Sequence, residues 1–497
     1  MNTRVVAFLL LFSDVIFVIT TSSISASNNE TDYEALLQFK SMITNDPYGA
    51  LSSWGNTTSF HFCDWNGVSW NLSFLRFFSL WNNSFQGSIP HELGRLSRLG
   101  VLDLRYNKFD GVIPSNLSRC SNLERLGLSY NKLTGSIPKE ISFLSKLTLL
   151  IIDSNKLIGG IPPVLGNLTS MQVFSAAFNP FGGSIPETLG RLKRLEQFGC
   201  GGCNLYGTIP HSIYNLSLLT IFSLNNNQLI GSLPSAIGSM LPRLVQLQLR
   251  DNQLVGNLPP SLSNSSKLQL FEMGNNNFSG KLEIDFARLK DLNFLSLGNN
   301  IFGSREADNM KFIDTLKNCS KLDTLDIFNC SFQGELPTSI GNLSDQLSFL
   351  EMGGNQFSGN LPSCIGNLVG LTTLLLDNSQ FTGKLPSTIG KLLKLQVAIF
   401  TRNQFSGPIP DTIGNLSSLN LLDLGYNRLE GHIPTNILQE DSIATQHTLA
   451  YANKIEDCLA STVKIGVSCS VDSPPQRMDI ENVVHELQHI LEKLQHI

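Results

Sequence analysis

LGVLDLRYNKFDGVIPSNLSRCSN, residues 99–122, is followed by LERLGLSYNKLTGSIPKEISFLSK, residues 123–146, and by LTLLIIDSNKLIGGIPPVLGNLTS, residues 147–170. The three segments share the template L-x-x-L-x-L-x-x-N-x-[LF]-x-G-x-[IL]-P. Aligned on the Asn column, the chain contains fifteen such units, and most steps are 24 residues, two are 25 and one is 30. A fixed period of this length predicts a solenoid in which each unit packs against its neighbours.

Each column of the template has a predicted structural role. The leucines at the first, fourth and sixth places point inward, and the L-x-L segment forms a short strand, since alternate residues of a strand face opposite sides. Successive strands stack in parallel at about 4.8 Å, so fifteen of them make a curved sheet roughly 70 Å long. The repeat therefore predicts an α/β solenoid with parallel strands on its concave face.

The Asn column is predicted to form a ladder of side-chain hydrogen bonds. Each amide turns inward where the chain leaves its strand and bonds the backbone of its own and neighbouring turns, because buried backbone groups need such partners. Cys or Ser in this column keeps some bonding capacity, and we interpret Cys203 and Cys330 as buried structural thiols, with a disulfide or a reactive thiol as the alternative. The Gly that follows permits an unusual backbone angle. The ladder column comprises Asn83, Asn107, Asn131, Asn155, Asn179, Cys203, Asn227, Asn252, Asn276, Asn300, Cys330, Asn355, Ser379, Asn403 and Asn427.

The N-terminus and the charge balance indicate an exported protein. Residues 1–26 are typical of a secretory signal peptide, because Arg4 precedes an apolar stretch over 5–19 and small residues follow. A buried strand or helix is the alternative interpretation of this stretch. The formal net charge of -5 gives no basic excess that would favour nucleic acid as a partner. No later segment approaches the ~18 apolar residues of a membrane span.

Thirteen N-x-[ST] sequons agree with an extracellular, glycosylated surface. Two of them, at Asn318 and Asn329, have Cys in the middle position, and a third lies at Asn29. The expected glycosylation sites are the other ten: Asn56, Asn71, Asn82, Asn116, Asn167, Asn215, Asn264, Asn277, Asn342 and Asn415.

HELQH, residues 485–489, fits the zinc-protease pattern H-E-x-x-H. On a helical wheel, apolar residues of this segment share one face, and His485, His489 and His496 lie on the opposite face. A zinc site also needs a third ligand, and little chain follows His489 to supply it. We interpret the segment as a solvated helix face, so no catalytic residue, metal or cofactor is predicted.

The G-x-[IL]-P ending resembles that of plant-type leucine-rich repeats, and the segment before the repeats resembles the N-terminal cap of plant leucine-rich-repeat receptor kinases. D-x-x-A-L-L-x-F-K, D-P-x-G-x-L-x-x-W and C-x-W-x-G-V are all present between Asp32 and Val68, but Trp70 replaces the last Cys of the cap pattern. The 30-residue unit from Gly298 resembles an insertion found in an immune-receptor-like subgroup. The resemblance implies a helical cap over 27–72, about fifteen repeats over 73–437, and a Cys63 that is free or mispaired.

Residues 455–497, after an irregular junction at 438–454, resemble the end of the kinase domain in the same family. The resemblance rests on I-G-x-x-C-S at 465–470, P-x-x-R-M at 474–478 and V-V-x-E-L at 483–487. The glycine-rich loop, H-R-D, D-F-G and A-P-E motifs of a kinase are missing, and so is a membrane helix. We therefore expect a short helical C-terminal tail that is a kinase remnant, and a chain without kinase activity.

The resemblance implies a receptor ectodomain that binds an extracellular peptide or microbe-derived ligand in defence or developmental signalling, with a shorter leucine-rich-repeat co-receptor as a further partner. The chain as written is expected to be secreted or extracellular, or at the plasma membrane if a full-length receptor exists. Contacts are expected on exposed strand positions of the concave face, where an ordinary solvated residue is the alternative. Polar candidates are Asp103, Arg105, Gln248, Asp251, Asp377 and Asp423. Aromatic and Arg side chains are favoured anchors, which gives Trp81, Tyr106, Tyr130, Phe178, Arg250, Phe328, Arg402 and Tyr426.

Three other functions compete with this one. An active kinase is implied by the tail and opposed by the missing motifs. A secreted stand-alone repeat protein, such as an enzyme inhibitor or a decoy, is favoured by the lack of a membrane helix. A truncated gene product is favoured by the missing C-terminal cap of the repeats.

Overall fold

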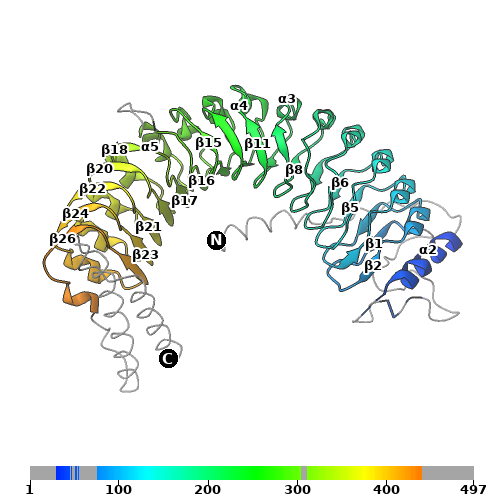
Figure 1. Cartoon of the computed structure of the whole chain (residues 1–497), viewed down its shortest axis with the longest axis horizontal. Coiled ribbons are helices and arrows are strands. Elements are labelled where there is room, and N and C mark those ends of the chain that lie inside the picture. Colours follow the sequence, from blue (N-terminus) through cyan, green and yellow to red (C-terminus); the bar gives the residue numbers. More distant parts are fainter. Residues whose placement is uncertain are drawn as a thin grey trace, which may run out of the picture.

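The computed structural model describes residues 29–44, 46, 51, 52, 54, 75–303 and 310–438. These residues form a curved solenoid with one long parallel sheet along its inner side (Figure 1), which confirms the predicted fold class. The predicted signal peptide, most of the junction, and the kinase-like tail with its HELQH segment lie outside the described residues. So do Asn56, Cys63, Trp70 and Asn71.

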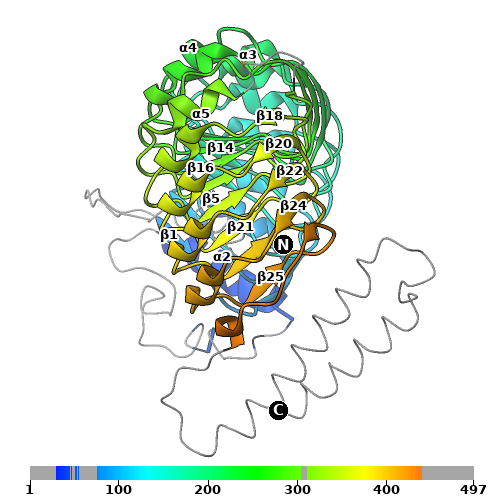
Figure 2. The ribbon, with the colours of Figure 1, turned by 90° about the vertical axis from the view of Figure 1, so that its left-hand side faces the viewer.

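The main sheet has fifteen strands of three residues each, and neighbouring strands pair in parallel and in register. Figure 2 shows these strands stacked one behind another along the solenoid. Each strand begins one residue before the L-x-L segment of its unit, so that its middle residue is the first apolar residue of that segment, as Leu102 is in β3. In most strands this middle residue is buried while its two neighbours face the concave side. The strands are β1 (Phe77–Ser79), β3 (Val101–Asp103), β5 (Arg125–Gly127), β6 (Leu149–Ile151), β7 (Val173–Ser175), β8 (Gln197–Gly199), β10 (Ile221–Ser223), β12 (Gln246–Gln248), β14 (Leu270–Glu272), β16 (Phe294–Ser296), β17 (Thr324–Asp326), β19 (Phe349–Glu351), β21 (Thr373–Leu375), β23 (Val397–Ile399) and β25 (Leu421–Asp423).

Three shorter parallel sheets form where the chain leaves the ladder column. Most of their strands end at or within two residues of the Gly that the template places after the [LF] residue, and that Gly has positive φ in most units. The strands are β2 (Gln86–Ser88) and β4 (Lys108–Asp110); β9 (Tyr206–Thr208), β11 (Gln228–Gly231), β13 (Gln253–Gly256) and β15 (Asn277–Phe278); and β18 (Gln333–Glu335), β20 (Gln356–Asn360), β22 (Gln380–Gly383), β24 (Gln404–Gly407) and β26 (Arg428–Leu429).

Short helices cover the convex side, and most of them are 3-10 helices that begin after the template Pro. A 3-10 turn closes in fewer residues than an α-turn, which suits a unit of about 24 residues that must return to the next strand. The convex helices are η2 (His91–Arg95), η3 (Ser115–Arg119), η4 (Lys139–Phe143), η5 (Pro163–Asn167), η6 (Glu187–Arg191), α3 (His211–Tyr214), α4 (Ile237–Met240), η7 (Pro260–Asn264), η8 (Phe286–Arg288), α5 (Lys311–Leu316), η9 (Thr338–Asn342), η10 (Ser363–Asn367), η11 (Ser387–Lys391), η12 (Asp411–Asn415) and η13 (Thr435–Leu438).

The N-terminal helix α2 (Asn29–Met42) covers the open end of the first repeat. Phe39 of α2 and the nearby Trp54 are fully buried, and their rings lie 5.4 Å and 5.6 Å from the ring of Phe78 in β1. These contacts remove the apolar edge of β1 from water, as the terminal unit of a repeat array requires.

The Asn residues of the ladder column bond backbone atoms of two adjacent units. Asn107 shows the geometry: its Nδ2 donates to the carbonyl oxygens of Leu80, Leu104 and Arg105 at 2.7, 3.2 and 3.2 Å, and its Oδ1 accepts from the amide of Phe85 at 3.1 Å. Cys203 donates through Sγ to the carbonyl of Ala176 at 3.2 Å. The expectation that Ser would also keep part of this bonding is wrong for Ser379, whose buried Oγ has no partner among the described residues.

Candidate ligand-binding groove

The concave face is built from rows of side chains that run across the strands. Because the strands are in register, the third residues of successive strands lie side by side at about 4.8 Å spacing. We call these residues the third-residue row, and they are Ser79, Asp103, Gly127, Ile151, Ser175, Gly199, Ser223, Gln248, Glu272, Ser296, Asp326, Glu351, Leu375, Ile399 and Asp423.

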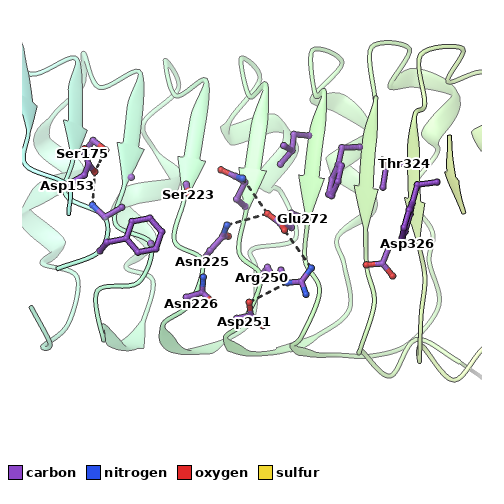
Figure 3. A pocket seen from close by; sticks show the side chains of 18 of the residues that line it. Asp153, Ser175, Ser223, Asn225, Asn226, Arg250, Asp251, Glu272, Thr324 and Asp326 are labelled. Carbon is purple, nitrogen blue, oxygen red and sulfur yellow. Dashed lines mark hydrogen bonds and ion pairs between the residues drawn. The ribbon is translucent and has the colours of Figure 1, made fainter. Parts of the chain in front are cut away.

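A groove of about 660 Å³ follows the concave face from Arg105 to Gln396. Its middle is lined by small residues, among them Ser175, Gly199, Gly201 and Ser223. These small side chains leave the backbone of the sheet uncovered here, whereas longer polar side chains extend from the strands after β10. Figure 3 shows this transition between Ser175 and Asp326.

The half of the groove that follows β10 is acidic. Asp251, Glu272, Asp323, Asp326 and Glu351 line it, and Arg250 is the basic residue among the described lining residues of this half. Arg250 Nε lies 3.3 Å from Asp251 Oδ2, and its Nη1 lies 3.9 Å from Glu272 Oε1 (Figure 3). One guanidinium therefore faces several carboxylates.

Burial raises the pKa values of three of these carboxyl groups, those of Glu272, Asp326 and Glu351. Burial raises the pKa of Glu351 to about 7, with further contributions from the charges of Asp326 and Asp377, while Arg250 opposes the shift. The pKa of Glu272 and that of Asp326 are also raised, in both cases mainly by burial. Carboxyl groups with raised pKa values in a cleft are candidates for a functional site.

Asp153, in the other half of the groove, is held by neutral donors. Its carboxylate accepts from Ser175 Oγ at 2.5 Å, from the amide of Ala177 at 2.8 Å and from Ser129 Oγ at 3.1 Å. Burial raises the pKa of Asp153 despite these hydrogen bonds. Because three donors of the protein already bind its carboxylate, we assign Asp153 a structural role within the groove lining.

The residue before each ladder position has a left-handed backbone, with φ between 49° and 67°. We call these residues the left-handed column: Asn82, Tyr106, Tyr130, Ser154, Phe178, Gly202, Asn226, Asp251, Asn275, Asn299, Asn329, Gly354, Asn378, Arg402 and Tyr426. Asn and Gly tolerate this conformation, whereas it is strained for bulky side chains. Strain of this kind, where a fold retains it, points to a role for the side chain.

None of the eight aromatic and Arg candidates lies within a strand, which corrects the expectation from the sequence. Trp81, Arg250 and Phe328 lie two residues after the ends of β1, β12 and β17. Tyr106, Tyr130, Phe178, Arg402 and Tyr426 follow their strands in the left-handed column, because the chain there turns to direct the next residue inward. Arg402 lies over the ring of Tyr426, with Cζ 5.4 Å from the ring centroid.

The groove brings together some of the predicted contact residues and not others. Tyr106, Tyr130, Phe178, Arg250 and Phe328 line it. Trp81 lies outside the lining, half exposed, with its ring 6.2 Å from that of Tyr106. Arg402 and Tyr426 lie beyond the opposite end of the groove.

Sequence reasoning missed Asn225, Glu272, Asp326 and Glu351, which line the acidic half. All four lie in the same columns of the template as Asp103 and Arg105, so aligning those columns across the units, with Glu and Asn included, would have found them. Within the described ranges, no group of His, Cys, Asp and Glu is arranged to hold a metal ion. In that same part of the chain, no helix has both the length and the apolar character needed to cross a bilayer.

Two family descriptions match this chain. The leucine rich repeat N-terminal domain matches residues 29–69. The leucine rich repeat matches residues 97–157 and, as single repeats, 74–96, 218–240, 243–265, 321–343, 346–368 and 370–392. The matched segments coincide with α2 and with units of the solenoid.

Curated relatives match over short stretches. Receptor kinase-like protein Xa21 of Oryza sativa subsp. japonica is 42% identical over 93 residues, which is 19% of this chain and 9% of that protein. The LRR receptor-like serine/threonine-protein kinase EFR of Arabidopsis thaliana is 37% identical over 99 residues, which is 14% of this chain and 9% of that protein. The chain thus matches less than a tenth of the length of either relative.

Solved plant receptor ectodomains share the fold. The GASSHO1/SCHENGEN3 ectodomain of Arabidopsis thaliana, in complex with CASPARIAN STRIP INTEGRITY FACTOR 2, is 34% identical with a TM-score of 0.63 over 72% of this chain and 45% of that chain. The plant peptide hormone receptor RGFR1, in complex with RGF2, is 30% identical with a TM-score of 0.68 over 76% of this chain and 62% of that chain. This chain is therefore a leucine-rich-repeat protein, with a leucine-rich-repeat N-terminal domain ahead of its repeats, and it is homologous to plant leucine-rich-repeat receptor kinases.

Proposed function

We propose that this chain is the extracellular ligand-recognition region of a receptor-kinase-type protein, has no kinase activity of its own, and binds a peptide in its concave groove. The observation that carries the proposal is the continuous groove over the in-register strands, with aromatic residues at one end and charged residues at the other. Two structures of the same fold support it: the GASSHO1/SCHENGEN3 ectodomain in complex with CASPARIAN STRIP INTEGRITY FACTOR 2, and the plant peptide hormone receptor RGFR1 in complex with RGF2.

The dimensions of the groove suit an extended peptide. Its lining residues come from the unit of Arg105 through the unit of Gln396, which are twelve steps apart along the ladder column from Asn107 to Asn403. At about 4.8 Å per strand this distance is roughly 58 Å, enough for about 16 residues of extended chain. Ligand pockets of this kind combine apolar surface with a few placed polar groups.

The expected glycosylation sites that the structure describes lie outside the lining of this groove. Asn167, Asn264, Asn342 and Asn415 are the last residues of convex helices, Asn215 directly follows another, and all five are exposed. Of the expected glycosylation sites, the eight that the structure describes do not line the groove. A co-receptor with shorter repeats remains part of the proposal as a further partner.

The test is a selection of random 15-residue displayed peptides on the full secreted chain. A Gly201→Trp variant fills the groove, because a Cβ at Gly201 would meet its nearest heavy atom at 3.4 Å, an ordinary contact, and the side chain would project over the floor. Ser145→Trp, at an exposed position after η4, is the control. We expect enriched peptides that bind the parent chain and the Ser145→Trp variant and bind Gly201→Trp at least tenfold more weakly. Absence of enriched peptides, or equal binding to both variants, would contradict the proposal.

A further inference from the structure

We propose that the groove selects peptides that carry a Lys or Arg side chain, and that Glu272, Asp326 and Glu351 receive this cation. The inference rests on the peptide-binding function proposed above and specifies the chemistry of the ligand. It follows from the arrangement of charges and from unused hydrogen-bond acceptors in the acidic half of the groove.

The first observation is a pair of like charges on adjacent strands. Asp326 of β17 and Glu351 of β19 occupy paired positions in the parallel ladder. Like charges placed directly opposite one another destabilise a sheet. Asp326 has partners, since its Oδ2 accepts from Ser296 Oγ at 2.7 Å and its Oδ1 from the amide of Phe328 at 3.0 Å. The carboxylate of Glu351 forms no hydrogen bond or ion pair with any described residue, although the residue is half-buried.

The charged groups nearest to Glu351 do not neutralise its carboxylate. The neighbouring strand contributes Asp326, and the unit on its other side contributes Asp377. Arg250, from β12's unit, attracts Glu351 from a distance but is already close to Asp251 and Glu272. A ligand cation bound here would reduce the repulsion between the carboxylates of Glu351, Asp326 and Asp377.

The second observation is a pair of buried amides whose carbonyl oxygens are unused. Asn225 and Gln248 are 9% and 6% exposed, and both line the groove. Their Nδ2 and Nε2 atoms donate to Glu272 Oε2 at 3.3 and 3.4 Å (Figure 3). Asn225 Oδ1 and Gln248 Oε1 have no partner within the described residues. Buried polar atoms are satisfied in most native structures, so these two oxygens point to a donor that comes from outside the chain.

The groups without a partner among the described residues, namely the two amide oxygens and the Glu351 carboxylate, are all acceptors. A ligand group that pairs with them must be a donor, and the surrounding carboxylates favour a positively charged one. A guanidinium offers five N–H donors and an ammonium three, and neither carries an acceptor. The carboxylates of Glu272, Asp326 and Glu351 and the two amide oxygens match such a donor. An anionic ligand group would meet repulsion from these carboxylates.

The neighbouring row leaves room for the incoming side chain. Two residues after the ends of β14, β16 and β19, the chain has glycines: Gly274, Gly298 and Gly353. The Asp326 carboxylate leans over Gly298, and that of Asp377 leans over Gly353, since a Cβ at either glycine would lie 2.6 Å from a carboxylate oxygen. The carboxylates therefore lie over bare backbone with no side chain between them and the groove.

The experiment uses four peptide libraries of 15 random residues whose central residue is fixed as Arg, Lys, Gln or Glu. Capture by the full secreted chain is compared with capture by a Glu272→Gln, Asp326→Asn, Glu351→Gln triple variant. The control, Asp110→Asn, Glu187→Gln, Glu335→Gln, removes the same charge at exposed carboxylates that do not line the groove. We expect the Arg or Lys library to be captured at least tenfold more than the Gln library by the parent chain and by the control. The ratio should fall to about one for the triple variant.

The outcomes separate this inference from the function on which it rests. If all four libraries are captured equally and Gly201→Trp abolishes capture, the groove binds peptides and the cation proposal is wrong. If the basic preference persists in the triple variant, the cation proposal is also wrong. If no library is captured, both proposals fail. Should the triple variant not fold, Glu351→Gln alone serves, because this side chain forms no hydrogen bond with the described residues, and it should reduce the ratio at least threefold.

Discussion

Tyr106 and Tyr130 stack face to face, with ring centroids 4.3 Å apart and ring planes 9° apart, and each has φ of 56°. A left-handed backbone costs a bulky residue about 1–2 kcal/mol, whereas a stacked aromatic pair contributes about 0.5–1.5 kcal/mol beyond its burial. Two adjacent repeats thus keep a strained backbone that Asn or Gly would relax, and in exchange they present a continuous aromatic surface at the end of the groove.

Replacing Tyr130 with Ala and with Gly separates the ring from the backbone strain. Ala loses the stacking and keeps the strain, so we expect the free energy of unfolding to fall by about 1–2 kcal/mol. Gly loses both, so it should be about 1 kcal/mol more stable than Ala. Urea unfolding measures both changes, and Tyr206→Ala, at an exposed position in β9, should change stability by less than about 0.5 kcal/mol. Equal destabilisation by Ala and Gly would show that the left-handed φ carries no cost here.

Ser379→Asn should repair the one ladder position at which a described side chain lacks a partner. In the next unit, Asn403 accepts from the amide of Phe381 at 3.1 Å and donates to the carbonyl of Leu376 at 2.8 Å. An Asn at 379 would reach the equivalent backbone atoms one unit earlier, and each buried hydrogen bond contributes about 1 kcal/mol. We expect the midpoint of thermal unfolding to rise, with a gain of about 1–2 kcal/mol. Ser387→Asn, at an exposed position in η11, is the control, and an unchanged midpoint for both variants would refute the ladder argument.

Stability should decrease as the pH rises through the titration of Glu351. Its pKa is raised to about 7 in the folded chain, against about 4.3 for an unfolded Glu. Between these values the folded state binds more protons than the unfolded state, so the free energy of unfolding falls with increasing pH and levels off above about pH 7. The side chain is partly exposed, and screening reduces the effect to roughly 1–2 kcal/mol. The raised pKa values of Glu272 and Asp326 act in the same direction.

Urea unfolding between pH 5 and pH 8 tests this prediction. Glu351→Gln should flatten the pH dependence and should be more stable than the parent chain at pH 8. Glu335→Gln, at an exposed position in β18, should keep the parent slope. A parent chain that gains stability across this range would have the opposite sign and would contradict the assignment.

Thiol labelling of the native chain should distinguish Cys364 from the buried cysteines. Burial raises the pKa of Cys319 to about 12, and the pKa of Cys330 is raised by burial and by the charge of Asp326. Since the thiolate is the reactive form, we expect half-buried Cys364 to react with iodoacetamide at least tenfold faster than Cys203, Cys319 and Cys330, which are fully buried. Mass spectrometry of peptides from a time course gives the rates. Early labelling of Cys203 or Cys330 would favour the reactive-thiol interpretation of these ladder positions.

The inward half of this fold could be predicted from the sequence because the same chemistry recurs in every unit. Leu102, Leu126 and Leu150 occupy equivalent buried positions in paired strands, and Asn107 and Asn131 occupy equivalent ladder positions. Each unit sets the same packing requirement, so fifteen aligned copies leave little freedom in strand position or direction.

The outward half follows no such repetition, and the prediction of the site was correspondingly partial. The hydrogen bond between Asn225 and Glu272 joins residues two units apart. The Asp326 carboxylate can lie over residue 298 of the preceding unit because that residue is a glycine. The turn that places Tyr106 off its strand is a backbone property of the residue before the ladder Asn. None of these relations is visible within a single unit, although the aligned columns contain all the residues involved.

The spacing of the third-residue row has a metric consequence for any extended ligand laid across it. Strands recur at about 4.8 Å and residues of an extended peptide at about 3.4 Å. Five strand spacings and seven peptide residues therefore both span roughly 24 Å. Asp326 of β17 lies five strands from Gly199 of β8 in the sheet order. A peptide whose basic side chain meets Asp326 would therefore place the residue about seven positions away over Gly199, where the small lining residues leave room for a large ligand side chain.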